Sequence, residues 1–397
     1  MSKKGLTLIL AGLAMVGPFS IDTYLPSFPA IAHSLGVDAV LMQQTLSVYL
    51  FAFALMMLFH GTLADTFGRR RVILIAIAIY TLASVGAALA PSFRMLLLFR
   101  AVQGACAGAG MVVGRAIVRD LMHGVEAQRM LAHITMVFGI GPAIAPILGG
   151  WLHTWFGWRS IFVFLACVGT TLGLIVYLRL PESLPRENRQ PAHVPTMLRN
   201  YYSAICNRQF VLLALSVGFG FSGFGLYVAA APDLIINILH LPETAFAWLF
   251  IPLISGQVLG AWASSRMANY AAPGEMVLRG YLFMLAGAIL NVAYNLWVEV
   301  PSVPWATLPL IVYTFGVALL IPTVTLRILD LFPHTRGLAA SLQSFIQTLV
   351  FALTSALVPV AFGSALKLAG GLSLGLLFSA SAYWVSTRVR KLPAPTV

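Results

Sequence analysis

The sequence predicts an all-α polytopic membrane protein with twelve transmembrane helices in two six-helix halves. Of its 397 residues, 59% are hydrophobic and only 9% are charged, and the mean hydropathy is +0.90. A water-soluble domain cannot cover so much apolar surface with polar side chains. A spanning helix needs about 20 apolar residues. Twelve such runs lie at approximately 5–28, 44–64, 71–90, 94–118, 130–153, 159–180, 209–232, 244–265, 276–298, 304–329, 337–362 and 369–388.

The longest polar interruption, at 181–208, is rich in proline and basic residues and separates six runs from six. We therefore expect an N-terminal half at 1–180, a cytoplasmic linker at 181–208 and a C-terminal half at 209–397, as in transporters built from two repeats. The charged hairpin at 61–71 has only a weakly similar counterpart at 260–270. The repeat is thus inferred from the number of spans more than from sequence similarity.

The distribution of basic residues indicates topology rather than a nucleic-acid partner, although the formal net charge is +12. With the N-terminus in the cytoplasm, only Arg94, Arg159 and Lys367 fall outside, and Arg100 and Arg115 lie within a span. All other basic residues fall on the cytoplasmic side, which is the positive-inside bias. We expect both termini to be cytoplasmic.

The cysteines and histidines predict no disulfide, metal site or cofactor. Cys106, Cys167 and Cys206 have no paired spacing, and the eight histidines are scattered along the chain. Disulfide and zinc frameworks require regular spacing or clusters of these residues.

Asp22 is the acidic residue that falls well inside an apolar run. Placing a charged side chain at such a depth costs about 2.5–3.5 kcal/mol on insertion scales, so an intramembrane acid indicates a functional site. We favour a proton carrier. The alternative is a structural carboxylate that lines a wet vestibule near the outer end of the span.

Arg100 is the expected charge partner of Asp22. A helix rises about 1.5 Å per residue, so both residues lie roughly 9 Å from the outer boundary of their oppositely directed spans. The sequence does not say which helices are neighbours. An arginine held by backbone carbonyl groups is the alternative.

Two further arginines lie near the inner end of the fourth run. Arg115 and Arg119 share a helix face because they are four residues apart. We expect Asp120 to pair with Arg119, a topology anchor, whereas Arg115 could reach a cavity open to the cytoplasm.

The fifth run is dense in glycine and proline, at Gly141, Pro142, Pro146, Gly149 and Gly150. Prolines remove backbone donors and kink a helix, and small residues allow helices to approach closely. We expect a conformational role for this run; an ordinary packing interface is the alternative.

Four segments together resemble the drug:proton antiporters of the major facilitator superfamily, especially their bicyclomycin- and chloramphenicol-resistance (Bcr/CflA) branch. The resemblance covers nearly the whole chain. Its residues are Asp22, Tyr24, Leu25 and Pro26 in the first span, Gly61, Leu63, Asp65, Gly68, Arg69 and Arg70 in the loop, and Arg100, Gln103 and Gly104 in the fourth span. The fifth-span antiporter motif is only partly kept, because Ala145-Pro146 replaces the usual Gly-Pro before Gly149-Gly150.

The resemblance implies a gating role for the loop. Asp65 would lie against the start of span 11, near residues 336–341, where a helix dipole stabilises a carboxylate by about 0.3–1 kcal/mol. With Arg69 it would hold the cytoplasmic side shut in the outward-facing state, and Gly61 and Gly68 would permit the close approach and the turn. A basic loop that only sets topology is the alternative.

The resemblance also places spans 1, 4, 7 and 10 around a central cavity. A mostly apolar cavity with a few polar groups suits uncharged or weakly basic amphipathic molecules. The candidate substrate-binding residues are Tyr24, Tyr49, Gln103, Arg115, Phe221, Tyr227, Tyr313, Gln343 and Gln347.

The expected function is export of small amphipathic drugs in exchange for protons, by a monomer in the inner membrane of a bacterium. A proton-coupled metabolite symporter or importer remains an alternative. A membrane-embedded enzyme is disfavoured, because such enzymes need clustered carboxylates for a metal or a nucleophile–base pair. The chain has one acid well inside its spans and no Walker motif.

Overall fold

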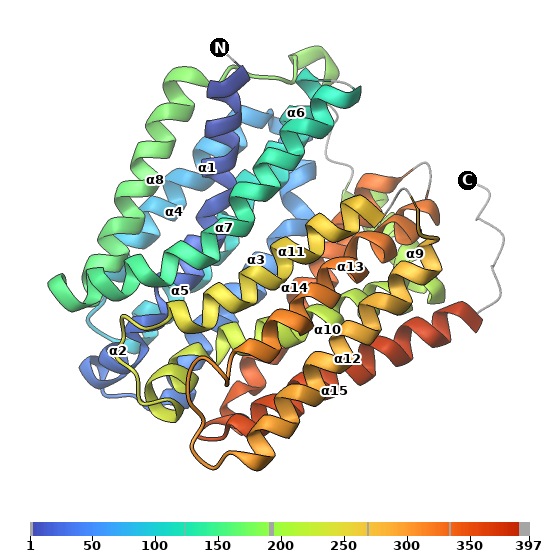
Figure 1. The fold of residues 1–397 in the computed structure, drawn as a ribbon. Coiled ribbons are helices and arrows are strands. Elements are labelled where there is room, and N and C mark those ends of the chain that lie inside the picture. Colours follow the sequence, from blue (N-terminus) through green and yellow to red (C-terminus); the bar gives the residue numbers. More distant parts are fainter. Residues whose placement is uncertain (1–2, 123, 190–193, 268–269, 333–334, 389–397) are drawn as a thin grey trace. The chain divides into compact units, whose positions relative to one another are not determined.

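The structure is a computed structural model, and every regular element in its described residues is a helix. The described residues are 3–122, 124–189, 194–267, 270–332 and 335–388. The chain forms two compact units (Figure 1). The N-terminal unit is 1–192 with 243–247, and the C-terminal unit is 193–242 with 248–397.

The N-terminal unit contains the first six long helical segments. Its elements are α1 (Lys3–Asp22), the 3-10 turn η1 (Leu25–Ser27), α2 (Phe28–Leu35), α3 (Ala39–Phe67), α4 (Arg69–Ala88), α5 (Phe93–Ala107), α6 (Ala109–Leu121), α7 (Gly124–Phe156), α8 (Arg159–Arg179) and η2 (Arg186–Asn188).

The C-terminal unit contains the other six, preceded by the short helix α9. Its elements are α9 (Val194–Cys206), α10 (Arg208–Ala229), the π-helical turn η3 (Asp233–Ile238), α11 (Ala247–Met267), α12 (Pro273–Trp297), α13 (Leu308–Asp330), α14 (Arg336–Leu357), η4 (Val358–Ala361) and α15 (Ala365–Arg388).

The helices match the predicted spans. Within the described residues, eleven are long and apolar enough to cross a membrane by length and composition. The fifth predicted run lies in α7, a further helix of 33 residues. Large apolar side chains such as Leu82, Leu98 and Phe378 are exposed on these helices. A surface of this kind suits lipid rather than water.

Two predicted spans are interrupted rather than continuous. The first leaves the α-helix after Asp22 and resumes at Phe28, and the fourth is interrupted at Gly108, between α5 and α6. Pro26 explains the first interruption, because it has no N–H to donate to the preceding turn. Both interruptions lie in the segments that carry the predicted charge pair.

Helix packing inside the N-terminal unit brings α1 against α7, α3 against α5, and α4 against both α5 and α8. A Cβ atom on Gly110 would lie 2.6 Å from the Leu13 carbonyl oxygen, so only glycine allows α6 to approach α1 this closely. In the C-terminal unit, α10 packs on α14 and α15, and α12 packs on α13.

Candidate functional site

Asp22 is the last residue of α1, just before the 3-10 turn that interrupts the first spanning segment. Its side chain is only 3% exposed. None of the described residues donates a hydrogen bond to its carboxylate or forms an ion pair with it. Buried charges in proteins are normally paired. The end of α1 is therefore an unusual place for an acidic residue.

Arg100 lies on α5 and is completely buried. Its guanidinium carbon is 4.5 Å from the centre of the Tyr24 ring and 4.3 Å from that of Tyr49, within cation–π distance. Its Nη1 donates to the Ser20 backbone carbonyl at 3.1 Å and to Oε1 of Gln103 at 3.0 Å. Its Nε and Nη2 atoms have no hydrogen-bond partner. The cation is held, but two of its donor atoms are unused.

Arg100 contacts α1 at Ser20, two residues before Asp22, so the two charged residues lie in neighbouring parts of the N-terminal unit. The expected direct pairing is not observed: no ion pair joins Asp22 to Arg100 in the described structure. Two tyrosine rings and a backbone carbonyl contact the guanidinium instead. Sequence spacing could predict the depth of each charge, but not the aromatic contacts supplied by α1 and α3.

A shell of small polar groups connects Arg100 to α4. Gln103 donates from Nε2 to the Ser84 hydroxyl at 2.8 Å, while Ser20 and Tyr80 share a hydrogen bond of 2.9 Å between their hydroxyl groups. The sequence did not predict a role for Ser20, Tyr80 or Ser84. Isolated hydroxyl residues are common in apolar helices and give no local signal of such a role.

Gly104 positions the Tyr49 ring over Arg100. A Cβ atom at Gly104 would collide with the Tyr49 carbonyl oxygen, so α5 can approach α3 only with glycine here. The Tyr24 ring is also fixed, because its hydroxyl shares a 3.0 Å hydrogen bond with Oγ1 of Thr45. The R-x-x-Q-G motif thus builds one compact site within the N-terminal unit.

The fifth span reaches the same site. α7 continues as one helix through Pro142 and Pro146. Gly141 lies against Pro18 of α1, with its Cβ position 3.5 Å from the Pro18 Cβ, and a Cβ on Gly149 would collide with the Thr23 carbonyl oxygen. Small residues therefore bring α7 against the end of α1, next to Asp22. Gly150 is buried as well.

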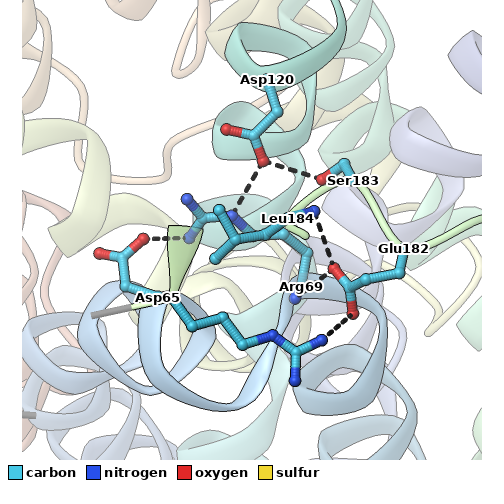
Figure 2. A network of polar contacts seen from close by, with 7 residues as sticks. Asp65, Arg69, Asp120, Glu182, Ser183 and Leu184 are labelled. Atoms are coloured by element: carbon cyan, nitrogen blue, oxygen red, sulfur yellow. Dashed lines mark hydrogen bonds and ion pairs between the residues drawn. The ribbon is translucent and has the colours of Figure 1, made fainter. Parts of the chain in front are cut away.

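At the other end of the N-terminal unit, Arg69 is the centre of an ion-pair network (Figure 2). Its Nη1 lies 2.5 Å from Oδ1 of Asp65, and its Nε lies 3.1 Å from Oδ2 of Asp120. The Ser183 hydroxyl donates to the same Asp120 oxygen at 2.8 Å. The expected Asp120–Arg119 pair was wrong, because the fold brings α4 rather than a sequence neighbour to this carboxylate.

Glu182 ties the chain after α8 to this loop (Figure 2). Its Oε1 accepts the backbone N–H of Arg69 at 2.9 Å and that of Leu184 at 3.2 Å. Gly68 has φ = 97°, and a Cβ there would lie 2.5 Å from Oε2 of Glu182. Glycine is required both for this backbone conformation and for the close approach. Glu182 and Ser183 were not predicted as site residues, because a proline-rich, basic linker gives no sign of contacts with a distant loop.

The two other loop residues differ in their surroundings. Arg70 donates from Nη2 to the Tyr177 carbonyl oxygen at 2.5 Å, which attaches α4 to the end of α8. Gly61 is less constrained, since its nearest neighbour is a Val112 methyl group 4.0 Å from the Cβ position. The predicted proximity of Asp65 to residues 336–341 stays a prediction.

Several predicted substrate contacts are buried inside their own unit. In the N-terminal unit these are Tyr24, Tyr49 and Gln103. In the C-terminal unit, the Tyr227 hydroxyl accepts a 2.6 Å hydrogen bond from Nδ2 of Asn291. In the N-terminal unit these side chains surround Arg100, and in the C-terminal unit Tyr227 is part of the buried core.

The remaining candidates have accessible or unpaired groups. Arg115 is exposed on α6, and Phe221 on α10 and Gln347 on α14 are half-buried. Gln343 donates to Oγ1 of Thr325 at 2.7 Å, while its own Oε1 is buried without a hydrogen-bond partner. An unpaired buried acceptor can receive a hydrogen bond from a ligand.

The chain is similar in sequence to known membrane transporters. Residues 10–355 match the Major Facilitator Superfamily. The chain is 30% identical over 400 residues to an uncharacterized MFS-type transporter, YdgK, of Bacillus subtilis, covering 98% of this chain and 96% of the relative. It is also 30% identical over 270 residues, 68% of each chain, to a bicyclomycin resistance protein homolog of Haemophilus influenzae.

Among solved structures, a D-xylose-proton symporter superposes with a TM-score of 0.77 over 99% of both chains, at 14% sequence identity. This likeness concerns the fold alone. Together with the family match, it agrees with the all-helical fold described above. The chain therefore belongs to the Major Facilitator Superfamily and is a multi-pass membrane transporter, not an enzyme.

Proposed function

We propose that this transporter exports small amphipathic compounds from a bacterial cell in exchange for protons. The observation that supports this most strongly is the buried Asp22 carboxylate, which has no partner among the described residues although Arg100 contacts the same helix. An unpaired charge is costly to bury. The arrangement suits an acid that carries a proton.

The unused donors of Arg100 suggest how proton binding changes the protein. When Asp22 loses its proton, the carboxylate needs a cation or hydrogen-bond donors, and Nε and Nη2 of Arg100 are free to supply them. Pairing would require the Asp22 side chain, or the end of α1 that carries it, to move toward Arg100. Proton and substrate can then bias an alternating-access equilibrium, provided that each binds the two states with different affinity.

The direction of transport is inferred from the resemblance and from one relative. The homolog in Haemophilus influenzae is named for bicyclomycin resistance, and the glycine- and proline-rich α7 packs beside Asp22. The basic residues support a cytoplasmic location of both termini in the inner membrane. We propose a monomer, because each unit encloses its own charged or polar core.

The decisive experiment measures proton-coupled transport by purified protein in proteoliposomes. Asp22→Asn keeps the size of the side chain but cannot bind and release a proton. We expect it to abolish substrate-induced proton movement while the protein stays folded. Asp38→Asn is the matched control, because Asp38 is an exposed helix cap whose acceptor role asparagine can take over.

Undiminished pH-driven transport by Asp22→Asn would remove this residue from the mechanism. The direction is tested in everted vesicles with a panel of amphipathic antibiotics that includes bicyclomycin. An exporter accumulates its substrate in such vesicles when their interior is acidic. An importer coupled to proton entry would instead release it.

A further inference from the structure

The short helix α9 carries an apolar surface that no other part of the described structure covers. Leu198, Tyr202 and Ile205 are 53%, 71% and 51% exposed. Their spacing of four and three residues places them on one face of the helix. Three large apolar side chains in a row on water-exposed helix surface are unfavourable unless something else covers them.

The helix face beside this stripe is fixed to the protein. Tyr201 and Ala204 are buried, and α9 packs against α10 and α14 of its own unit. Arg199 is exposed on the far side of the stripe, and Ser203 is exposed beyond it. Going around the helix, a face packed on protein is followed by an apolar face and then by a polar, basic face.

The connection to α10 places this surface at the membrane boundary. One residue, Asn207, joins the two helices, with φ = −76° and ψ = 101°, and its Oδ1 caps α10 by accepting the Phe210 N–H at 3.0 Å. Because Asn207 is not helical, α9 turns away from the direction of α10. Ile205 is only three residues from Arg208, where the spanning helix begins.

We propose that α9 lies in the interfacial layer of the bilayer, with Leu198, Tyr202 and Ile205 inserted below the headgroups and with Arg199 and Arg208 bound to anionic lipid phosphates. Amphipathic helices with apolar and basic faces bind membranes in this orientation. Arg199 and Arg208 are both exposed and match the negative charge of the lipid surface. The leaflet is the cytoplasmic one under the topology of the proposed function.

The first test compares two neighbouring positions on α9 in protein whose three native cysteines are replaced by serine. Tyr202→Cys and Ser203→Cys are each labelled with an environment-sensitive fluorophore and reconstituted in phosphatidylcholine vesicles with or without phosphatidylglycerol. We expect blue-shifted emission at position 202, quenched by spin-labelled lipid, and water-like emission at position 203. The readout does not depend on transport, so it stands apart from a failure of the exporter proposal.

Equal water exposure at both positions would overturn the proposal. So would blue-shifted emission at position 202 without quenching by lipid, because protein would then cover the stripe. A second test measures the extra quenching that phosphatidylglycerol produces at position 202. Arg199→Gln combined with Arg208→Gln should remove it, whereas Arg266→Gln, which removes one exposed positive charge elsewhere, should not. Extra quenching that persists in the double variant would exclude headgroup binding.

Discussion

Both units join their first and fourth spanning segments by a hydrogen bond to a backbone carbonyl, but the donor is charged in one unit and neutral in the other. In each, the fourth spanning segment reaches a backbone carbonyl of the first. Arg100 donates to the Ser20 carbonyl at 3.1 Å in the N-terminal unit, and the Tyr313 hydroxyl donates to the Gly220 carbonyl at 3.1 Å in the C-terminal unit. One contact carries a charge and the other does not.

The two units also differ in the acidic residue near the end of their first spanning helix, which is hydrogen-bonded in the C-terminal unit and unpaired within the described part of the N-terminal unit. Asp233, which follows the first spanning helix of the C-terminal unit, is buried with both oxygens satisfied, by Asn237 Nδ2 and by the Gly363 N–H, each at 2.8 Å. Asp22, at the end of the first helix of the N-terminal unit, has no such partner among the described residues. A satisfied carboxylate stabilises one structure, whereas an unsatisfied one can respond to a proton. Under the proposed function, this difference favours the N-terminal unit as the part of the protein that couples protons to transport.

We expect the largest difference in coupled transport between variants of Arg100 and of Tyr313. Arg100→Gln removes the cation between Tyr24 and Tyr49, and we expect coupled transport to be lost. Tyr313→Phe removes one neutral hydrogen bond, which costs about 0.5–1.5 kcal/mol of stability, and should leave coupling intact. Proton movement in proteoliposomes and thermal unfolding in detergent measure the two effects. Loss of coupling in Tyr313→Phe would contradict an uncoupled C-terminal core.

Asparagine variants of Asp233 and Asp22 are expected to affect different properties, the first the stability of the protein and the second its proton coupling. Asp233→Asn places an amide N–H₂ group opposite a donor, so one buried hydrogen bond is lost at a cost of about 1–3 kcal/mol. We expect a lower unfolding temperature with normal proton movement. Asp22→Asn should show the reverse pattern, with little loss of stability. A large destabilisation by Asp22→Asn would indicate partners for Asp22 that the described residues do not provide.

Two glycines at tight helix contacts provide a comparison of packing. A Cβ on Gly149 would collide with the Thr23 carbonyl oxygen, and a Cβ on Gly287 would lie 2.6 Å from the Tyr313 backbone nitrogen. Overpacking typically costs about 1–3 kcal/mol, so both alanine variants should be less stable. Only Gly149→Ala displaces the end of α1 beside Asp22, and we expect only this variant to slow transport. Equal transport rates per folded molecule would remove α7 from the coupling mechanism.

The smallest expected difference concerns the loops at the other end of each unit. Arg69 pairs with Asp65 and Asp120, whereas Arg266, in the corresponding segment, lies over the Trp262 ring at 5.4 Å. Arg69→Gln should destabilise the N-terminal unit by about 1 kcal/mol, because ion pairs at partly exposed sites contribute little. It should also speed proteolytic cleavage near Ser183. Arg266→Gln should change neither; equal effects would mean that the network has no special role.

The order of the helices and the position of the charged residues were predictable from the sequence. Hydrophobic runs of about 20 residues predict spanning segments because backbone groups must be satisfied inside the helix. The turn at Gly68 was predictable from a glycine in a charged loop, whereas the common depth of Asp22 and Arg100 in the membrane stays a prediction. Each of these properties depends on residues close together in the chain.

The contacts of those residues depended on the tertiary structure. Tyr24 and Tyr49 come from two helices to enclose Arg100, and Asp120 and Glu182 come from distant segments to meet the chain at Arg69. Helix periodicity says which face a residue occupies, but not which helix lies opposite. Partner choice is decided by packing, where glycines such as Gly104 and Gly149 set how closely the helices approach.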